Sequence, residues 1–168
     1  MNKKIYTITL LVILMFLITS MRNLFITDIK KVAISNNNIE SFNKYILREG
    51  KYSLSLPEGW DIDSKSNDSS DIITTFNNNE DIYGSISIMN IDKESIYKNI
   101  KGDTKSIRVI EEDYKWINII EGNGKNISNY YVRDYSEGKV LIIKFSYTEG
   151  KEKNSIKIVF DYIANSFI

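Results

Sequence analysis

The chain contains no cysteine and no histidine, and its single proline is Pro57. Without cysteine there are no disulfides, no thiol nucleophile, no zinc–thiolate site and no lipid attached through a cysteine. Without histidine, the usual general base and the usual transition-metal ligand are both missing. We therefore expect a protein that is not an enzyme, and the sequence offers no catalytic residue and no cofactor-binding motif.

An excess of charge of one sign is also missing, because 22 basic residues balance 22 acidic ones. Nucleic-acid binding depends on a concentrated basic surface, so we expect no nucleic-acid partner. The 168 residues allow one domain and a short appendage, and a hydrophobic fraction of 42% is enough for a core. The abundance of Ile, Asn and Lys is typical of proteins from AT-rich bacterial genomes.

A long apolar run stands at the N-terminus. Lys3 and Lys4 precede Ile5–Ile18, and the run can extend through Met21 before Arg22. A secretory signal has an apolar region of roughly 7–15 residues, whereas a membrane helix needs about 20. The segment lies between these lengths. It therefore suits either a signal anchor that stays in the membrane or a signal peptide that is cleaved.

We favour the uncleaved anchor, because Ile18 occupies a position where a cleavage site prefers a small residue. This reading places residues 1–4 in the cytoplasm and a transmembrane helix over 5–21, because basic residues stay on the cytoplasmic side. The protein would be a single-pass protein of the cell membrane with the bulk of its chain outside the cytoplasm. Secretion after cleavage is the alternative.

Residues 22–49 read as a juxtamembrane connector or helix. Three apolar residues recur there at helical spacing: Ile39, Phe42 and Ile46. Gly50 follows at a position that suits a helix C-terminal cap. The pattern predicts a short helix that ends before Gly50. It would serve as a stalk or pack on the following domain.

From Lys51 the periodicity changes to the alternation of strands. We expect Asp92 to cap a helix and Gly84 to mark a bulge. The pattern of residues 107–111 leaves their secondary structure ambiguous. The expected strands cover 52–56, 60–62, 72–76, 82–91, 115–121, 127–135 and 140–147, and the expected helices cover 93–101 and 152–167. Short hairpin connections make the sheet mainly antiparallel, so the fold class is α+β with helices packed on the sheet.

The stretch Tyr52–Leu56 has the sequence YSLSL and is followed by PEGW. This strand and the turn after it resemble the start of the domain in the PsbP-like family, which is named after an extrinsic protein of photosystem II. Strand 82–91 followed at once by a helix, the tandem hairpins and a closing helix ending IANSF fit the same pattern. The resemblance covers 50–168, which we take as one extracytoplasmic domain. It implies an α/β/α sandwich, and many bacterial relatives are exported or anchored proteins. The metal-linked histidines of the photosynthetic members have no counterpart here.

The segment Asp61–Asp71 is the best candidate for a cation site. Calcium loops carry oxygen ligands at their first, third and fifth positions, but Lys65 stands at the fifth. A different arrangement, with Asp63, Asp68 and Asp71 as ligands of Ca²⁺, is the metal hypothesis. The alternative is a solvated loop whose Asp and Ser side chains form turns.

Tyrosines gather on two neighbouring predicted strands. Tyr131 and Tyr135 share one face of their strand, and Tyr130 lies on the other. Tyr131 and Tyr135 are the candidates for a partner surface, with core packing as the alternative. The carboxylate run Glu111–Asp113 reads as a charged strand edge, because adjacent side chains point in different directions.

These observations favour a non-catalytic, membrane-anchored accessory or interaction protein of the bacterial envelope. Its expected partners are the membrane, through the N-terminal helix, and a protein of the envelope. The alternative is a module that binds a small ligand or a divalent cation. A partner-binding module should expose an aromatic patch, whereas a ligand binder should contain an apolar pocket with a few polar groups.

Overall fold

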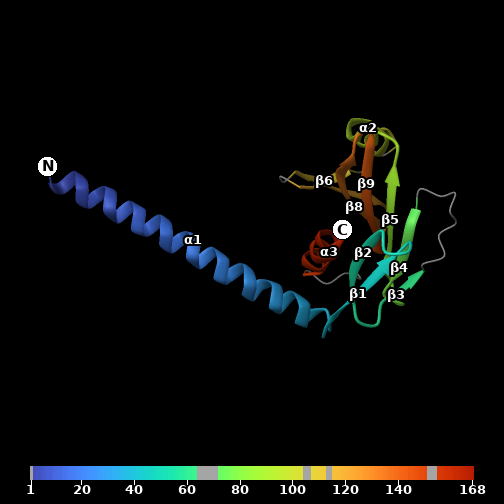
Figure 1. Ribbon diagram of the computed structural model, residues 1–168, viewed down its shortest axis with the longest axis horizontal. Coiled ribbons are helices and arrows are strands. Elements are labelled where there is room, and N and C mark those ends of the chain that lie inside the picture. The colour runs from blue at the N-terminus through green and yellow to red at the C-terminus, as the bar shows by residue number, and fades with distance from the viewer. Residues whose placement is uncertain (1, 64–71, 104–106, 113–114, 151–154) are drawn as a thin grey trace.

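The computed structural model describes residues 2–63, 72–103, 107–112, 115–150 and 155–168. It consists of a long N-terminal helix and a folded domain (Figure 1). Helix α1, Asn2–Asn36, has 35 residues and continues without a break through Arg22. The helix is therefore much longer than the span predicted over 5–21. Most of it extends away from the domain, and its C-terminal end meets the domain.

A seven-stranded sheet forms the centre of the domain, in the order β3-β4-β5-β9-β8-β7-β6. Every neighbouring pair in it is antiparallel. The strands are β3 (Asp61–Asp63), β4 (Ile72–Asn77), β5 (Tyr83–Met89), β6 (Ile107–Glu112), β7 (Ile117–Asn123), β8 (Asn126–Ser136) and β9 (Lys139–Thr148). The ambiguous segment 107–111 is thus an edge strand. The α+β class and the antiparallel sheet are confirmed.

Helix α3, Ile156–Ser166, covers one face of the sheet together with a separate hairpin of β1 (Phe42–Leu47) and β2 (Tyr52–Pro57). The rings of Phe145 on β9 and Phe160 on α3 stack with their centroids 4.0 Å apart. Leu54 and Leu56 of β2 are fully buried in the same core. This face holds most of the buried apolar surface of the domain.

Helix α2, Lys93–Asp103, lies on the opposite face, where Ile96 packs against Val132 and Val140. Asp92 caps it as expected, because its carboxylate accepts hydrogen bonds from the backbone N–H and the hydroxyl of Ser95 at 2.8 and 2.7 Å. Helices therefore lie on both faces of the sheet (Figure 1), as predicted.

The prediction of a short helix before Gly50 is wrong. Residues 42–47 form β1, which pairs with β2 from Phe42↔Pro57 to Leu47↔Tyr52. Gly50 has a φ of 89° and lies in the turn of this hairpin. The pairing buries Leu47 and leaves Ile46 71% exposed, so the helical spacing of the apolar residues does not describe the buried face. The folded domain therefore includes residues 39–49, which the sequence assigns to the connector.

The last residue of the chain is bound to the hairpin. The backbone N–H and C=O groups of Ser53 and Ile168 exchange hydrogen bonds of 2.9 and 3.1 Å. The hydroxyl of Ser166 also accepts a hydrogen bond from the N–H of Ser55 at 2.9 Å. The end of α3 is thus attached to β2, which fixes where the helix lies over the sheet.

Gly84 does not mark a bulge, because its pairing with Phe76 on β4 and Phe145 on β9 is regular. The irregularity of β4–β5 falls between Ile72 and Thr74 instead. Glycine is required at 84 because a Cβ atom there would collide with the ring of Phe76, which is only 2% exposed.

We expect Gly84→Ala to destabilise the domain by about 1–3 kcal/mol, because the buried ring of Phe76 must shift within a packed core. Urea unfolding of the purified chain measures the loss. Ser85→Ala is the matched control, since Ser85 is next in the same strand and points to the other face. A Gly84→Ala variant as stable as this control would contradict the packing described here.

Candidate functional site

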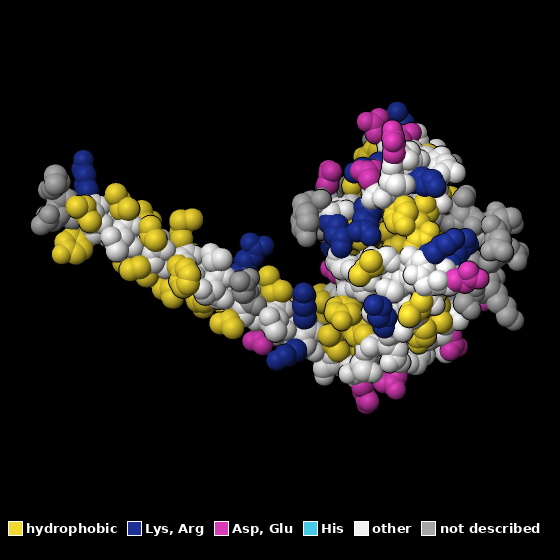
Figure 2. Space-filling view, in the orientation of Figure 1, with side chains coloured by type: hydrophobic (Ala, Val, Ile, Leu, Met, Phe, Trp, Pro, Cys, Tyr) yellow, Lys and Arg dark blue, Asp and Glu magenta, His cyan; other side chains and the backbone are white. Residues whose placement is uncertain are grey.

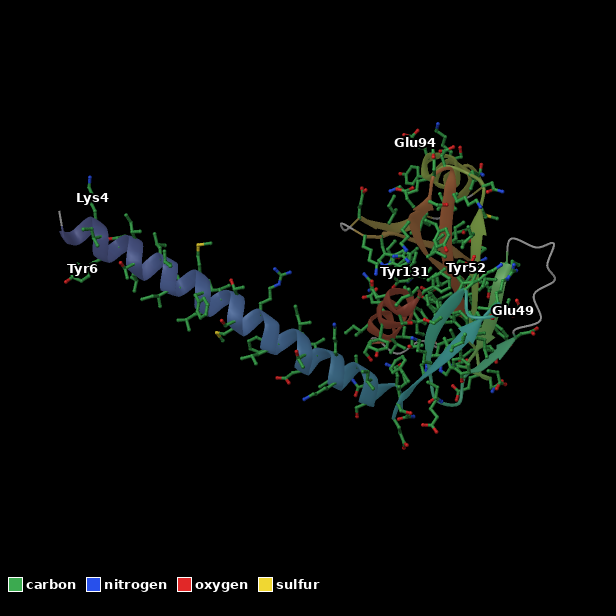
Figure 3. The ribbon with its side chains drawn as sticks, viewed as in Figure 1. Lys4, Tyr6, Glu49, Tyr52, Glu94 and Tyr131 are labelled. Atoms are coloured by element: carbon green, nitrogen blue, oxygen red, sulfur yellow. The ribbon has the colours of Figure 1, made fainter. Side chains whose placement is uncertain are left out.

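Tyr131 is a core residue, so its assignment to a partner surface is wrong. It is 2% exposed, and its hydroxyl donates a hydrogen bond of 2.6 Å to the carboxylate of Asp161 on α3. Figure 3 shows its position beside α3. The sequence placed the residue on a face of β8 but did not show that α3 covers this face.

Tyr135 lies at the exposed end of the same face and is 43% exposed. Its ring centroid is 6.4 Å from that of Tyr52, which stacks on Phe167 at 5.5 Å. Tyr131 and Tyr135 therefore share a face, as predicted, but only Tyr135 is placed where a partner could reach it. Its role as a partner residue stays a prediction.

The three aspartates of the metal hypothesis fall at the boundary of the described chain. Asp63 ends β3 and is exposed, and its backbone carbonyl accepts a hydrogen bond of 2.8 Å from the Thr74 hydroxyl. Asp68 and Asp71 lie outside the described residues. Among the residues that are described, no group of three or more His, Cys, Asp or Glu side chains lies close enough together to hold a metal ion. The Ca²⁺ site stays a prediction.

A polar cluster lies beneath α3, between the helix and strands β7 and β8. The carbonyl oxygen of the Asn165 side chain accepts hydrogen bonds from the indole N–H of Trp116 and the ammonium of Lys115, each at 3.0 Å. The guanidinium of Arg133 lies 4.8 Å from the centroid of the Trp116 ring. With the bond from Tyr131 to Asp161, these contacts attach α3 to the sheet through polar groups.

Three buried polar atoms in this region have no hydrogen-bond partner among the described residues. They are the side-chain carbonyl oxygens of Asn118 and Asn129 and the Nε of Arg133. Buried polar groups of this kind usually bind ordered water, and each costs free energy when it stays unpaired. A cavity of about 410 Å³ beside Asn118 and Tyr131 is large enough to hold water.

The electrostatics of the cluster suit a structural role. Burial, followed by the negative charge of Asp161, raises the pKa of Tyr131 far above its usual value, so its phenol stays neutral. Burial also lowers the pKa of Arg133. A neutral tyrosine that donates to a carboxylate holds α3 in place but offers no general base at neutral pH.

On the other face of the sheet, burial and the charge of Glu121 raise the pKa of Tyr130 to about 12. Its hydroxyl donates to the Glu121 carboxylate at 3.1 Å, and the Lys144 ammonium lies 5.2 Å from its ring centroid. The hydroxyl and the ring of Tyr130 are thus engaged by side chains of neighbouring strands, so Tyr130 is not part of the candidate partner surface.

A second cavity, of about 620 Å³, forms an apolar groove between the C-terminal part of α1 and α3. Ile26, Ile29 and Ile34 line one wall, and Ile158 and Tyr162 line the other. This α1–α3 groove lies between the domain and α1, and most of the side chains named here are apolar. No pattern in the sequence predicts the groove, because its two walls come from opposite ends of the chain.

Contacts at the end of α1 hold the groove in shape. Ala33 is 1% exposed, and the side-chain amide of Asn37 donates hydrogen bonds to the carbonyl of Ala33 at 2.7 Å and to the Ser155 hydroxyl at 2.9 Å. The ring of Tyr162 packs on Phe42 with their centroids 4.2 Å apart. The groove is therefore part of the packed structure of the domain.

Comparisons with known proteins identify the fold. The structure is similar to cyanobacterial PsbP (CyanoP) from Synechocystis, with 16% identity, a TM-score of 0.50, and coverage of 77% of this chain and 93% of that one. It is also similar to a point mutant of protein Mog1, with 9% identity, a TM-score of 0.55, and coverage of 76% and 95%. No family model and no curated protein matches the sequence. The domain thus has the PsbP-like fold, as the sequence resemblance indicated.

We expect Tyr131→Phe to lower the free energy of unfolding at pH 7 by about 1–3 kcal/mol, because Asp161 loses a hydrogen bond and the nearby buried amides lose a polar neighbour. Urea unfolding of the purified chain measures the change. Tyr83→Phe is the matched control, since Tyr83 is 63% exposed and its hydroxyl can be replaced at little cost. Equal stabilities of the two variants would show that the Tyr131–Asp161 bond contributes little.

The same pair of variants tests the raised pKa of Tyr131. In the unfolded chain a tyrosine loses its proton near pH 10, whereas Tyr131 keeps its proton in the folded state. The stability that Tyr131 contributes is therefore complete below about pH 10 and falls by about 1.4 kcal/mol per pH unit above it. Between pH 10 and 11, Tyr131→Phe should lose stability less steeply than the wild type and Tyr83→Phe. Equal slopes would contradict a buried, neutral Tyr131.

Proposed function

We propose that the chain is a non-catalytic accessory protein of a bacterial envelope, anchored by α1 and carrying its PsbP-like domain outside the cytoplasm. The observation that carries the proposal is the exposed apolar surface of α1. Lys4–Asn36 is a candidate membrane span, and none of its most apolar 18-residue window is buried against the domain. Side chains such as Leu10, Leu14 and Phe16 are more than half exposed. A bilayer provides the apolar surroundings that such a surface needs.

The orientation rests on the N-terminal charges. Lys3 and Lys4 precede the apolar run within one helical turn, and basic residues next to a span favour the cytoplasmic side. The folded domain would then follow the span on the outer side of the membrane. Arg22 lies near the outer end of the span, and Lys30 and Lys31 follow it.

The chemistry of the domain supports a role in binding. The chain contains no histidine or cysteine, and the buried Tyr131 and Asp161 hold each other in place within the cluster beneath α3. Tyr135 is an exposed aromatic side chain of the kind that is enriched in interfaces. An accessory protein that presents this side chain to an envelope partner agrees with both observations.

We expect the full chain to stay with the membrane fraction after alkaline carbonate extraction. Val12 and Leu14 lie near the middle of the apolar run, where an arginine costs about 2.5–3.5 kcal/mol. The double variant Val12→Arg/Leu14→Arg should therefore move to the soluble fraction. Val12→Leu/Leu14→Ile, which keeps the run apolar, should stay with the membrane. If the arginine variant remains membrane-bound after extraction, α1 is not the anchor.

The topology can be measured with single cysteines, because the chain has none of its own. Glu137 lies in the exposed turn between β8 and β9, and Lys4 is exposed at the start of α1. A maleimide that does not cross membranes should label Glu137→Cys in intact spheroplasts and label Lys4→Cys only after permeabilisation. The reverse pattern would place the domain in the cytoplasm and overturn that part of the proposal.

A further inference from the structure

The α1–α3 groove carries an inference that rests on the proposed anchoring by α1. We propose that this groove docks the domain on the phospholipid surface of the same bilayer that holds α1. The domain would then lie against the membrane, with α3 in contact with the lipid headgroups.

The position of the groove along α1 is the first argument. A hydrocarbon core about 30 Å thick takes about 20 helical residues, so a span that begins at Ile5 ends near Leu24. At about 1.5 Å per residue, Ile26 and Ile29 lie about 3 Å and about 8 Å beyond that point. The headgroup layer on each side is about 5–7 Å thick. The wall of the groove therefore begins at the depth of the headgroups.

The chemistry of the two walls is the second argument. Apolar side chains from both helices line the groove, and Tyr162 on α3 is 45% exposed. Tyrosine is enriched at the membrane interface, because its ring is apolar and its hydroxyl is polar. An apolar groove with tyrosine at its edge fits the boundary between acyl chains and headgroups.

Charged side chains at and near the groove are the third argument for phospholipid. Lys30 lines the groove and, with Lys157, also lines the neighbouring cavity beneath α3. Figure 2 shows Lys and Arg side chains on the side of the domain that looks toward the free part of α1. Asp161 also lines the groove, and its carboxylate accepts the hydrogen bond of Tyr131. Lys30, on the wall that belongs to α1, places an ammonium group at the groove that can pair with lipid phosphates.

A lipid fits the groove better than a protein segment does. One wall is the helix that itself enters the bilayer, so lipids already surround Ile26 and Ile29 when α1 is inserted. A protein segment would have to displace those lipids, whereas the bilayer fills the groove without any further partner. The contacts of Ala33 and Asn37 with the domain keep α3 next to the membrane while this happens.

The test uses the full chain in liposomes of phosphatidylcholine and phosphatidylglycerol, with no other protein present. A nitroxide is attached to a single cysteine in Phe16→Cys, Tyr162→Cys or Tyr83→Cys, and electron paramagnetic resonance measures its collisions with oxygen and with a water-soluble nickel chelate. Tyr83 is the control, because it is 63% exposed on β5. We expect the nickel collisions to be several-fold fewer at 162 than at 83, and fewest at 16.

The three labels separate the two proposals. A label at 16 that is as accessible to nickel as the one at 83 overturns the proposed anchor. A label at 16 in the hydrocarbon together with an aqueous label at 162 leaves the anchor in place and overturns the docking. Near-ultraviolet circular dichroism checks that each labelled chain is folded.

A second variant tests the groove itself. In the Tyr162→Cys background, Ile158→Asp places a charge on the same wall and should raise the nickel accessibility of the label toward that at 83. Lys98→Asp, on the exposed side of α2, is the matched control and should leave it low. If Ile158→Asp leaves the label protected from nickel, the α1–α3 groove is not what meets the lipid.

Discussion

The contact between the last turns of α1 and the start of α3 is the interaction on which the arrangement of the whole chain depends. Ala33 is buried there, and the side chain of Asn37 bridges to Ser155. Only residues 37–41 separate α1 from β1. The domain is therefore packed against the end of α1. When α1 is inserted in a bilayer, the orientation of the helix sets the orientation of the domain.

Helix α3 connects this contact with α1 to the sheet. On its inner side Phe160 stacks on Phe145, and Asp161 accepts the hydrogen bond of Tyr131. Its C-terminal end is attached to β2 by the backbone bonds between Ser53 and Ile168. Because apolar and polar contacts both hold α3, its outer side is presented in one position, as a wall of the α1–α3 groove.

Local patterns predicted most of the strands, because each depends on residues close together in the chain. The alternation in 52–56 identified β2, the apolar stretch 140–147 after a turn identified β9, and Asp92 marked the start of α2. The PEGW stretch that begins at the last residue of β2 pointed to the PsbP-like fold, which the similarity to PsbP and Mog1 confirms. Alternation also placed Tyr131 and Tyr135 on one face of β8.

The errors arose where distant segments meet. Nothing near Ile46 in the sequence says that its segment pairs with β2, so apolar residues at helical spacing predicted a helix in place of β1. Tyr131 is buried because α3, which follows later in the chain, lies over it. Gly84 is required by the ring of Phe76 on a neighbouring strand. The α1–α3 groove needs both ends of the chain, and no local pattern predicts it.

The most direct test concerns where the domain lies relative to the bilayer that α1 is proposed to span. Neutron reflectometry of the full chain in a supported bilayer measures protein and water density along the membrane normal. We expect protein density within the hydrocarbon layer and a domain that begins at the headgroups, with no layer of water between them. A separate water layer between headgroups and domain, or no protein in the hydrocarbon, would contradict it.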